Sequence, residues 1–254
     1  MFCGLHYNLR VNPRKQNMSG IPFYIGNFLA CFVPDSNRRS RFRGNVNIAL
    51  YRPRIMAFIK SAFGERVKNI KFIRQRTLNR MVCLVNDEYY VKIFRNVTVQ
   101  QLKNYKFLLD FIRPHISVEI PFIMVDNHIP MYACKKMMGR KIDDFDKSVV
   151  LKNEAKIKRQ VAKIINELQS VTLTSVPNAE RFTFSMQPER TKEKPCVAVH
   201  PVLAHFDMNE TNFLFDDDLN IIGVLDWDTL SVAQNPETDN NIFMKYWNKY
   251  KNGD

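Results

Sequence analysis

Several polar side chains near the end of the chain have the types and spacing that phosphoryl transfer needs. His205, Asp207 and Asn212 form a His-x-Asp-x4-Asn array, and Asp226 opens an Asp-Trp-Asp triplet further along. The reaction needs a carboxylate that accepts a hydroxyl proton and oxygen ligands that hold Mg2+ on the ATP phosphates. We therefore predict Asp207 as the base and Asn212 and Asp226 as ligands of Mg2+, an ion that prefers hard oxygen ligands.

The stretch between these residues is predicted to position them. Two apolar runs, 212–215 and 221–225, flank the polar turn 216–220, and this pattern predicts a strand, a turn and a strand. Such a hairpin brings Asn212 and Asp226 to the same side of a rigid element. The alternative is a polar turn between two core strands with no chemistry, but an ordered set of this kind is more specific than a lone Asp-x4-Asn.

This stretch resembles the catalytic segment of the aminoglycoside phosphotransferase and choline kinase superfamily, where the pattern is His-Gly-Asp, four residues, Asn, an apolar strand, and Ile-Asp-Trp-Glu. Phe206 replaces the usual Gly, and Leu225 and Asp228 stand where Ile and Glu are common. Residues 235–239 resemble the Pro-x-x-Asp that anchors the next helix in that superfamily.

The resemblance implies an α+β, bilobal protein-kinase-like fold. We expect a basic, partly helical N-terminal extension at 1–66, a five-stranded antiparallel N-lobe at 67–133, and a mainly helical C-lobe with the catalytic and metal loops at 134–254. Apolar patterns predict strands at 69–76, 81–85, 89–94, 118–125 and 129–134, and helices at about 98–111, 151–170 and 240–249.

Lys92 lies on the predicted strand 89–94. A lysine on an apolar strand at this place matches the lysine that pairs with ATP phosphates in kinase-like folds. The alternative is an edge-strand lysine that points to water. The turn Thr77–Arg80 has no glycine, which argues against a protein kinase, and the helix 98–111 has no Glu, which leaves Lys92 without an assigned partner.

Residues 132–139 are predicted to be the hinge that binds adenine. The resemblance implies that backbone groups near Cys134 bind the base and that Met137 or Met138 covers its face, with Gly139 at the far end. Plain core filling by the methionine pair is the alternative.

Composition sets outer bounds on the class of protein. The chain has 254 residues and is 45% hydrophobic, enough for a real core and one or two domains. Five cysteines are scattered without a Cys-x-x-Cys pair, so neither a zinc site nor a disulfide framework is indicated. No signal peptide is visible, and we expect a cytoplasmic protein.

The net charge of +13 is uneven, because residues 1–66 hold eleven Lys and Arg against two acidic residues. An apolar segment, 21–33, is too short to span a bilayer and precedes an arginine cluster at 38–43. Three interpretations stay open: a peripheral position on the inner, anionic membrane surface, a helix packed on the body, and nucleic-acid binding, which the uneven charge disfavours.

We therefore predict an ATP- and Mg2+-dependent phosphotransferase acting on a hydroxyl of a sugar or amino-alcohol. Residues 28–43 resemble a short segment that precedes some bacterial surface-polysaccharide enzymes, so a glycan acceptor is included. The loop 172–195 is expected to contribute to the acceptor site, and the single helix after Asp239 suggests an open one. The alternatives are a catalytically inactive nucleotide-binding scaffold and a membrane-associated adaptor.

Overall fold

The computed structural model describes residues 25, 29, 30, 36–77, 80–172 and 201–253. The chain divides into two compact units, one of residues 1–86 and 92–96 and the other of residues 87–91 and 97–254. Each unit is described by itself. Most of the apolar segment 21–33 and nearly all of the predicted loop 172–195 lie outside the described residues.

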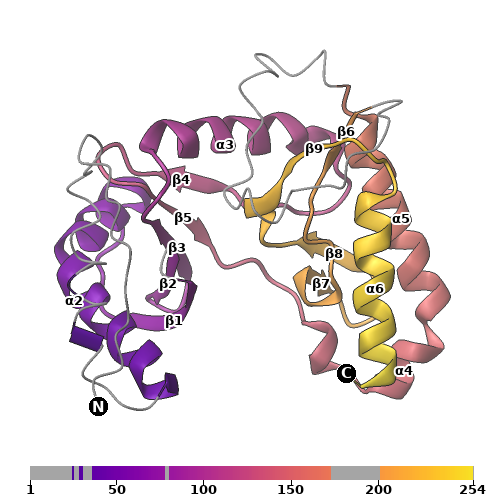
Figure 1. Ribbon diagram of the computed structural model, residues 1–254, viewed down its shortest axis with the longest axis horizontal. Coiled ribbons are helices and arrows are strands. Elements are labelled where there is room, and N and C mark those ends of the chain that lie inside the picture. Colours follow the sequence, from indigo (N-terminus) through magenta and orange to yellow (C-terminus); the bar gives the residue numbers. More distant parts are fainter. Residues whose placement is uncertain (1–24, 26–28, 31–35, 78–79, 173–200, 254) are drawn as a thin grey trace, which may run out of the picture. The chain divides into compact units, whose positions relative to one another are not determined.

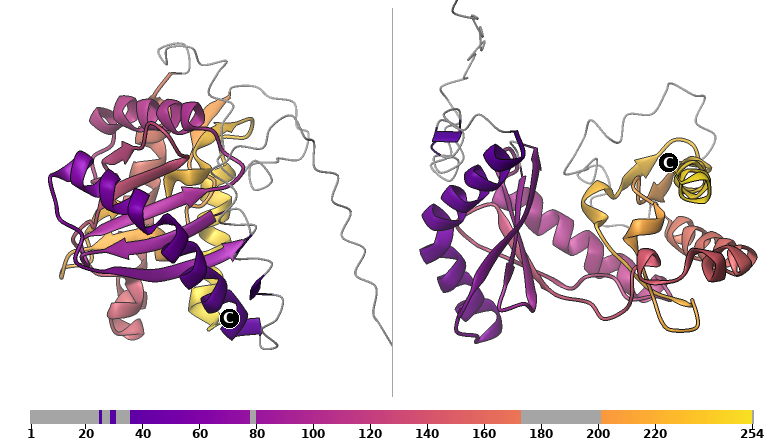
Figure 2. Two further views of the ribbon diagram at one scale, coloured as in Figure 1. Left: turned by 90° about the vertical axis from the view of Figure 1, so that its left-hand side faces the viewer. Right: turned by 90° about the horizontal axis from the view of Figure 1, so that it is seen from below.

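In the first unit a long helix, α2 (Ser36–Phe63), packs on the strands (Figure 2). Its buried residues Tyr51, Ile55 and Ile59 recur at a spacing of four, which places them on one face. Gly44 lets the helix backbone lie close to the ring of Phe72, because a Cβ on residue 44 would lie 2.2 Å from a carbon of that ring. Residues 36–63 thus form a packed helix, the second of the three interpretations above. No helix within the described ranges is long and apolar enough to cross a membrane.

Five strands form one antiparallel sheet in the order β1-β2-β3-β5-β4 (Figure 1). Four of the five predicted strands are confirmed with small shifts of their ends. The prediction of a strand over 118–125 is wrong in its first half, because β4 begins only at Ile123. Pro121 has no N–H to donate to a ladder, and Glu119 pairs with Gly223 instead. The strand bounds are β1 Ile70–Thr77, β2 Arg80–Val85, β3 Tyr89–Phe94, β4 Ile123–Val125 and β5 Met131–Lys135.

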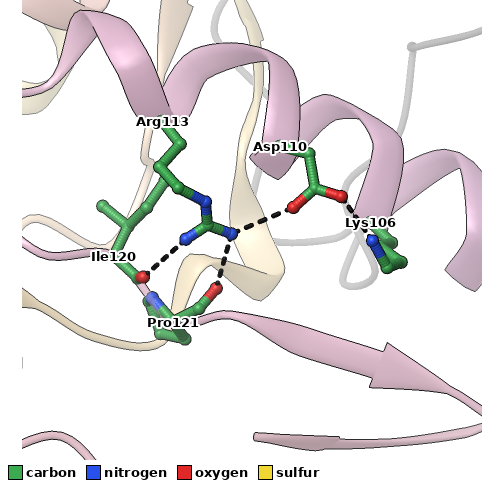
Figure 3. A network of polar contacts seen from close by, with 5 residues as sticks. All are labelled: Lys106, Asp110, Arg113, Ile120 and Pro121. Atoms are coloured by element: carbon green, nitrogen blue, oxygen red, sulfur yellow. Dashed lines mark hydrogen bonds and ion pairs between the residues drawn. The ribbon is translucent and has the colours of Figure 1, made fainter.

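Helix α3 (Val99–Ile112) packs against β4 and β5 in the second unit. At its start, Thr98 and Gln101 form a capping box, which stabilises the first turn. At its end, Arg113 donates to the carbonyls of Ile120 (2.9 Å) and Pro121 (3.3 Å) and to Asp110 (3.0 Å), as Figure 3 shows. Asp110 also pairs with Lys106. Asp110, near the end of α3, is therefore paired with both Lys106 and Arg113.

Three further α-helices lie in the described part of the second unit: α4 (Lys147–Lys152), α5 (Glu154–Ser170) and α6 (Thr238–Asn252). The helical pattern predicted from residue 151 is interrupted at Asn153, where α4 ends and α5 begins. The apolar stripe of α5 is buried, and α5 contacts α6, which lies beside it in Figure 1.

Glu154 joins the two long helices, and the contact predicts a pH dependence. Its carboxylate accepts from Trp247 Nε1 (3.0 Å) and pairs with Lys158 (2.7 Å) and Lys251 (3.0 Å). Hydrogen bonds from these two lysines lower the pKa of Glu154 from 4.5 to about 2. The folded-state pKa is depressed, so its stabilising effect is present above pH 4.5 and is lost as the pH falls towards 2.

We expect Glu154→Gln to lower the melting temperature at pH 7, and this difference from the wild type should shrink steadily below pH 4.5. Thermal unfolding between pH 2.5 and pH 7 measures it. A difference that stays constant over that range would contradict the ion pairing, because Gln does not titrate.

Candidate active site

Two short antiparallel ladders frame the segment that holds the predicted catalytic residues. β6 (Val202–Ala204) pairs with β9 (Ser231–Ala233), and β7 (Phe213–Phe215) pairs with β8 (Ile221–Val224). The intervening loops, 205–212 and 225–230, are therefore joined at both ends. This geometry forces the two loops to lie side by side, and the His-x-Asp array and the Asp-Trp-Asp triplet come from different loops of the same frame.

The β7–β8 hairpin is held from three directions. Glu119 exchanges backbone hydrogen bonds with Ile222 and Val224 on one edge, and Arg140 exchanges two with Phe215 on the other, all at 2.8–2.9 Å. The third contact comes from α5, where the side-chain amide of Gln160 donates to the carbonyl of Leu219 and accepts from the N–H of Ile221. The predicted hairpin is thus present and rigidly mounted, as a site built on strands requires.

His205 is buried and bridges the two loops. Its Nδ1 accepts from the backbone N–H of Asp207 (3.2 Å), so its Nε2, 3.0 Å from the carbonyl oxygen of Leu225, is the nitrogen that donates. The ring lies 4.6 Å from that of Trp227. Both ring nitrogens contact backbone groups, so His205 has a structural role in this loop.

Asp239 anchors the start of the loop 205–212 from the N-terminal turn of α6. Its two oxygens accept the backbone N–H groups of His205 (2.7 Å) and Phe206 (2.8 Å), and the residue is fully buried. Burial raises the pKa of this carboxyl above its ordinary value, although the two N–H groups favour the charged form. The Pro-x-x-Asp anchor implied by the sequence is therefore formed by specific hydrogen bonds.

Phe206 explains how the loop tolerates the loss of the usual glycine. Its φ is 60°, in the left-handed region that glycine adopts easily and that strains a bulky residue by about 1–3 kcal/mol. Its ring is buried with Ala204 and Ala233, with Val202 packed against them. Burial of a large aromatic ring offsets a strain of this size.

Asp207 lies on this loop and is buried, with the residue 6% exposed. Asn209 Nδ2 donates to its Oδ1 at 3.0 Å, and the amides of Asn209 (3.2 Å) and Asn212 (2.8 Å) both donate to its backbone carbonyl. The carboxylate is therefore held in one orientation with little water around it. Asn209 is a site residue that the sequence analysis missed, and its only signal is an amide two positions after the predicted base.

Asp226 follows β8 at a sharp turn. Its φ is 57°, and it caps a short 3-10 helix, η9 (Trp227–Thr229). The preceding residue, Leu225, donates its N–H to the carbonyl of Asn212 at 2.8 Å, so Asp226 is next to the residue that pairs with Asn212. An uncommon backbone conformation fixed by its surroundings is typical of functional sites.

A buried polar chain holds the other side of this turn. The hydroxyl of Tyr132, on β5, donates to Asp228 Oδ1 at 2.6 Å, and both residues are buried. The ring of Tyr105, on α3, lies 6.0 Å from that of Tyr132. Burial and the charge of Asp228 raise the pKa of both phenols, so the Tyr132 hydroxyl stays protonated and remains a donor.

We expect Tyr132→Phe to lower the free energy of unfolding by about 1.5–3 kcal/mol, the range for a hydrogen bond to a charged group. The change removes one oxygen and leaves a buried carboxylate with one donor fewer. Urea denaturation measures the loss, with Tyr246→Phe on α6 as the matched control. An effect no larger than that of the control would show that Asp228 does not depend on this hydroxyl.

The predicted hinge residues differ in their surroundings. Cys134 is buried at the end of β5, and Met138 is 80% exposed. Met137 is buried with its Cε 2.7 Å from where a Cβ on Gly223 would lie, so it packs on the hairpin. Gly139 has a φ of 128°, and a Cβ there would lie 2.9 Å from Leu214 Cβ, which explains the glycine. Adenine binding by Cys134 and Met137 stays a prediction.

Lys92 lies half-buried on β3. It belongs to the first unit, whereas Asp207, Asn212 and Asp226 belong to the second. The contacts described bring the latter three together, and the pairing of Lys92 with phosphate stays a prediction.

The donor set fits Mg2+, which keeps several waters and takes one or two carboxylates together with substrate phosphates. Among the described residues no group of three or more His, Cys, Asp or Glu side chains is placed to hold a metal. Asn212 and Asp226 form a smaller set of one amide and one carboxylate. Because the amide nitrogen of Asn212 donates to the Asp207 carbonyl, its oxygen is directed away from that bond.

The five-stranded antiparallel sheet, the helices and these loops together make up a kinase-like fold. The sequence itself matches no protein-family model and no curated protein. The fold matches solved structures. The GDP complex of wild-type aminoglycoside 2'-phosphotransferase-IIIa aligns with a TM-score of 0.54 at 15% identity, covering 77% of this chain and 78% of that one.

Two further structures have the same fold. Macrolide 2'-phosphotransferase MphH from Brachybacterium faecium aligns with a TM-score of 0.53 at 16% identity, covering 79% of this chain and 82% of that one. The streptomycin–ATP ternary complex of APH(2'')-IIa aligns with a TM-score of 0.53 at 18% identity, with coverages of 73% and 74%. The predicted fold class is confirmed, and none of these comparisons supports binding to a membrane surface.

Proposed function

We propose that this protein is an ATP- and Mg2+-dependent phosphotransferase that phosphorylates a hydroxyl of a sugar or amino-alcohol, free or part of a glycan. One observation carries the proposal: the oriented carboxylate of Asp207 shares a rigid frame with Asn212 and Asp226. The solved structures of the same fold are aminoglycoside and macrolide 2'-phosphotransferases, in complexes that include GDP and ATP. Their acceptors are also hydroxyl-bearing small molecules.

In the proposed reaction Asp207 accepts the proton of the acceptor hydroxyl. The acceptor oxygen forms a bond to the γ-phosphorus while the bond from that phosphorus to the β–γ bridging oxygen breaks, and ADP leaves. Asn209 keeps the Asp207 carboxylate in place through the 3.0 Å hydrogen bond. Mg2+, held by Asn212 and Asp226, would neutralise negative charge on the phosphates.

The acceptor is identified by turnover assays with Mg2+ and either ATP or GTP, since a neighbouring complex contains GDP. The panel comprises sugars, amino-alcohols, aminoglycosides, macrolides and glycolipid extracts, and product mass is read for one added phosphoryl group. Wild type is compared with Asp226→Ala and with Asp217→Ala, whose side chain is 90% exposed. Acceptor-dependent turnover by the wild type and Asp217→Ala, but not by Asp226→Ala, supports the proposal. A wild type that binds neither ATP nor GTP overturns it.

A nucleotide-binding scaffold without catalysis is the second candidate. It is favoured by the turn Thr77–Arg80, which has no glycine, and by α3, which has no Glu. Nucleotide binding in titrations, combined with no turnover over the whole panel, would support it over the transferase.

A further inference from the structure

Hydrogen bonds fix the backbone at Lys141 and at the residue before it. The preceding residue, Arg140, is paired with Phe215 of β7. The N–H of Lys141 itself donates to Asp144 Oδ2 at 2.7 Å, at the start of a short 3-10 helix, η4 (Ile142–Asp144). The direction of its side chain is thus set by the same hairpin that carries the candidate site.

The ammonium group of Lys141 reaches the catalytic loop. Its Nζ donates to the backbone carbonyl of Thr211, the residue before Asn212. Burial lowers the pKa of this ammonium below its ordinary value. Three carboxylates partly oppose that shift and so lie within electrostatic reach: Asp226, Asp144 and Asp143. The cation is therefore at the edge of the Asp207–Asp226 site and partly removed from water.

Charge balance suggests what this cation does. The loop 207–212 contains no lysine or arginine, and the proposed site contributes the carboxylates of Asp207 and Asp226. A nucleoside triphosphate adds several more negative charges, and one divalent ion does not cancel them all. Phosphoryl transfer relies on cations fixed beside the phosphates. An ammonium has three donors, and Thr211 accepts only one of them.

We propose that Lys141 binds a phosphate of the nucleotide in this site. The inference rests on the proposed function. The competing interpretation is a purely structural tether between the segment after β5 and the catalytic loop. The two differ in what they require: a tether needs a donor to Thr211, whereas phosphate binding needs a positive charge.

The test uses Lys141→Gln, which keeps an N–H donor and removes the charge, and Lys141→Arg, which keeps both. Lys152→Gln, which makes the same change at an exposed lysine on α4 outside the predicted hinge, is the matched control. Calorimetric titrations of the full chain with ATP, ADP, AMP and adenosine, each with Mg2+, give the affinities. Thermal unfolding without nucleotide reports any loss of stability.

We expect Lys141→Gln to weaken ATP binding by about tenfold, the effect of losing one charge-assisted contact, and to leave adenosine binding unchanged. Lys141→Arg should recover most of the loss, and Lys152→Gln should match the wild type. Equal losses for ATP and adenosine, or no loss, would overturn the role of Lys141 while the transferase proposal stands. A wild type that binds no nucleotide would instead overturn the proposed function, and this inference with it.

Discussion

Replacing Asp207 with Asn should lower kcat for acceptor phosphorylation by about 100- to 10,000-fold, the usual contribution of a general base. The substitution keeps the size of the side chain and an Oδ1 that can accept from Asn209, so the loop should keep its shape. What disappears is the ability to take the acceptor proton. Because Asp207 is assigned to the acceptor and not to the metal, the Kd for ATP with Mg2+ should change by less than about threefold.

Single-turnover kinetics with a saturating acceptor, together with ATP titration, separate these effects. Asp217→Asn is the matched control, since it makes the same chemical change at a hairpin carboxylate that is 90% exposed. If Asp207→Asn kept more than about a tenth of the wild-type kcat, proton transfer to this residue would not be part of the rate-limiting chemistry. A large loss of ATP affinity would place Asp207 among the phosphate or metal contacts instead.

The parts of this site that sequence could predict are those built from neighbouring residues. The hairpin from Phe213 to Val224 follows from two apolar runs and a polar turn, and the structure contains it. The spacing of Asp207 and Asn212 within one loop identifies them as a pair in the same way. Local periodicity carries this information because the contacts join residues that are close along the chain.

The remaining parts depend on contacts between residues far apart in sequence. The hydrogen bond from Tyr132 to Asp228 spans 96 positions, and the one from Lys141 to the Thr211 carbonyl spans 70. No periodic pattern encodes such pairs. The pairing of β6 with β9 was missed because three-residue strands are too short to show alternation. Sequence therefore located the candidate reactive groups, but most of the contacts that orient them became visible only in the fold.

Among the substitutions predicted to affect stability, Asp239→Ala should lower the free energy of unfolding the most. It removes both acceptors of the buried N–H groups of His205 and Phe206. Each unsatisfied buried donor costs about 1–3 kcal/mol, so we expect a loss of about 2–6 kcal/mol. A domain has only about 5–15 kcal/mol of stability, so the variant should be at the limit of folding at 25 °C.

Asp239→Asn makes the prediction measurable even if the alanine variant does not fold. Asn keeps one carbonyl acceptor, but its amide donors would face one of the two N–H groups, so an intermediate loss is expected. Urea unfolding at pH 7 ranks wild type, Asp217→Asn, Asp239→Asn and Asp239→Ala in order of decreasing stability. Asp239→Asn as stable as the exposed control would mean that the N–H groups find other acceptors. A graded loss would instead show that a single carboxylate on α6 fixes the start of the loop 205–212, although Asp239 lies 32 positions after Asp207 in the sequence.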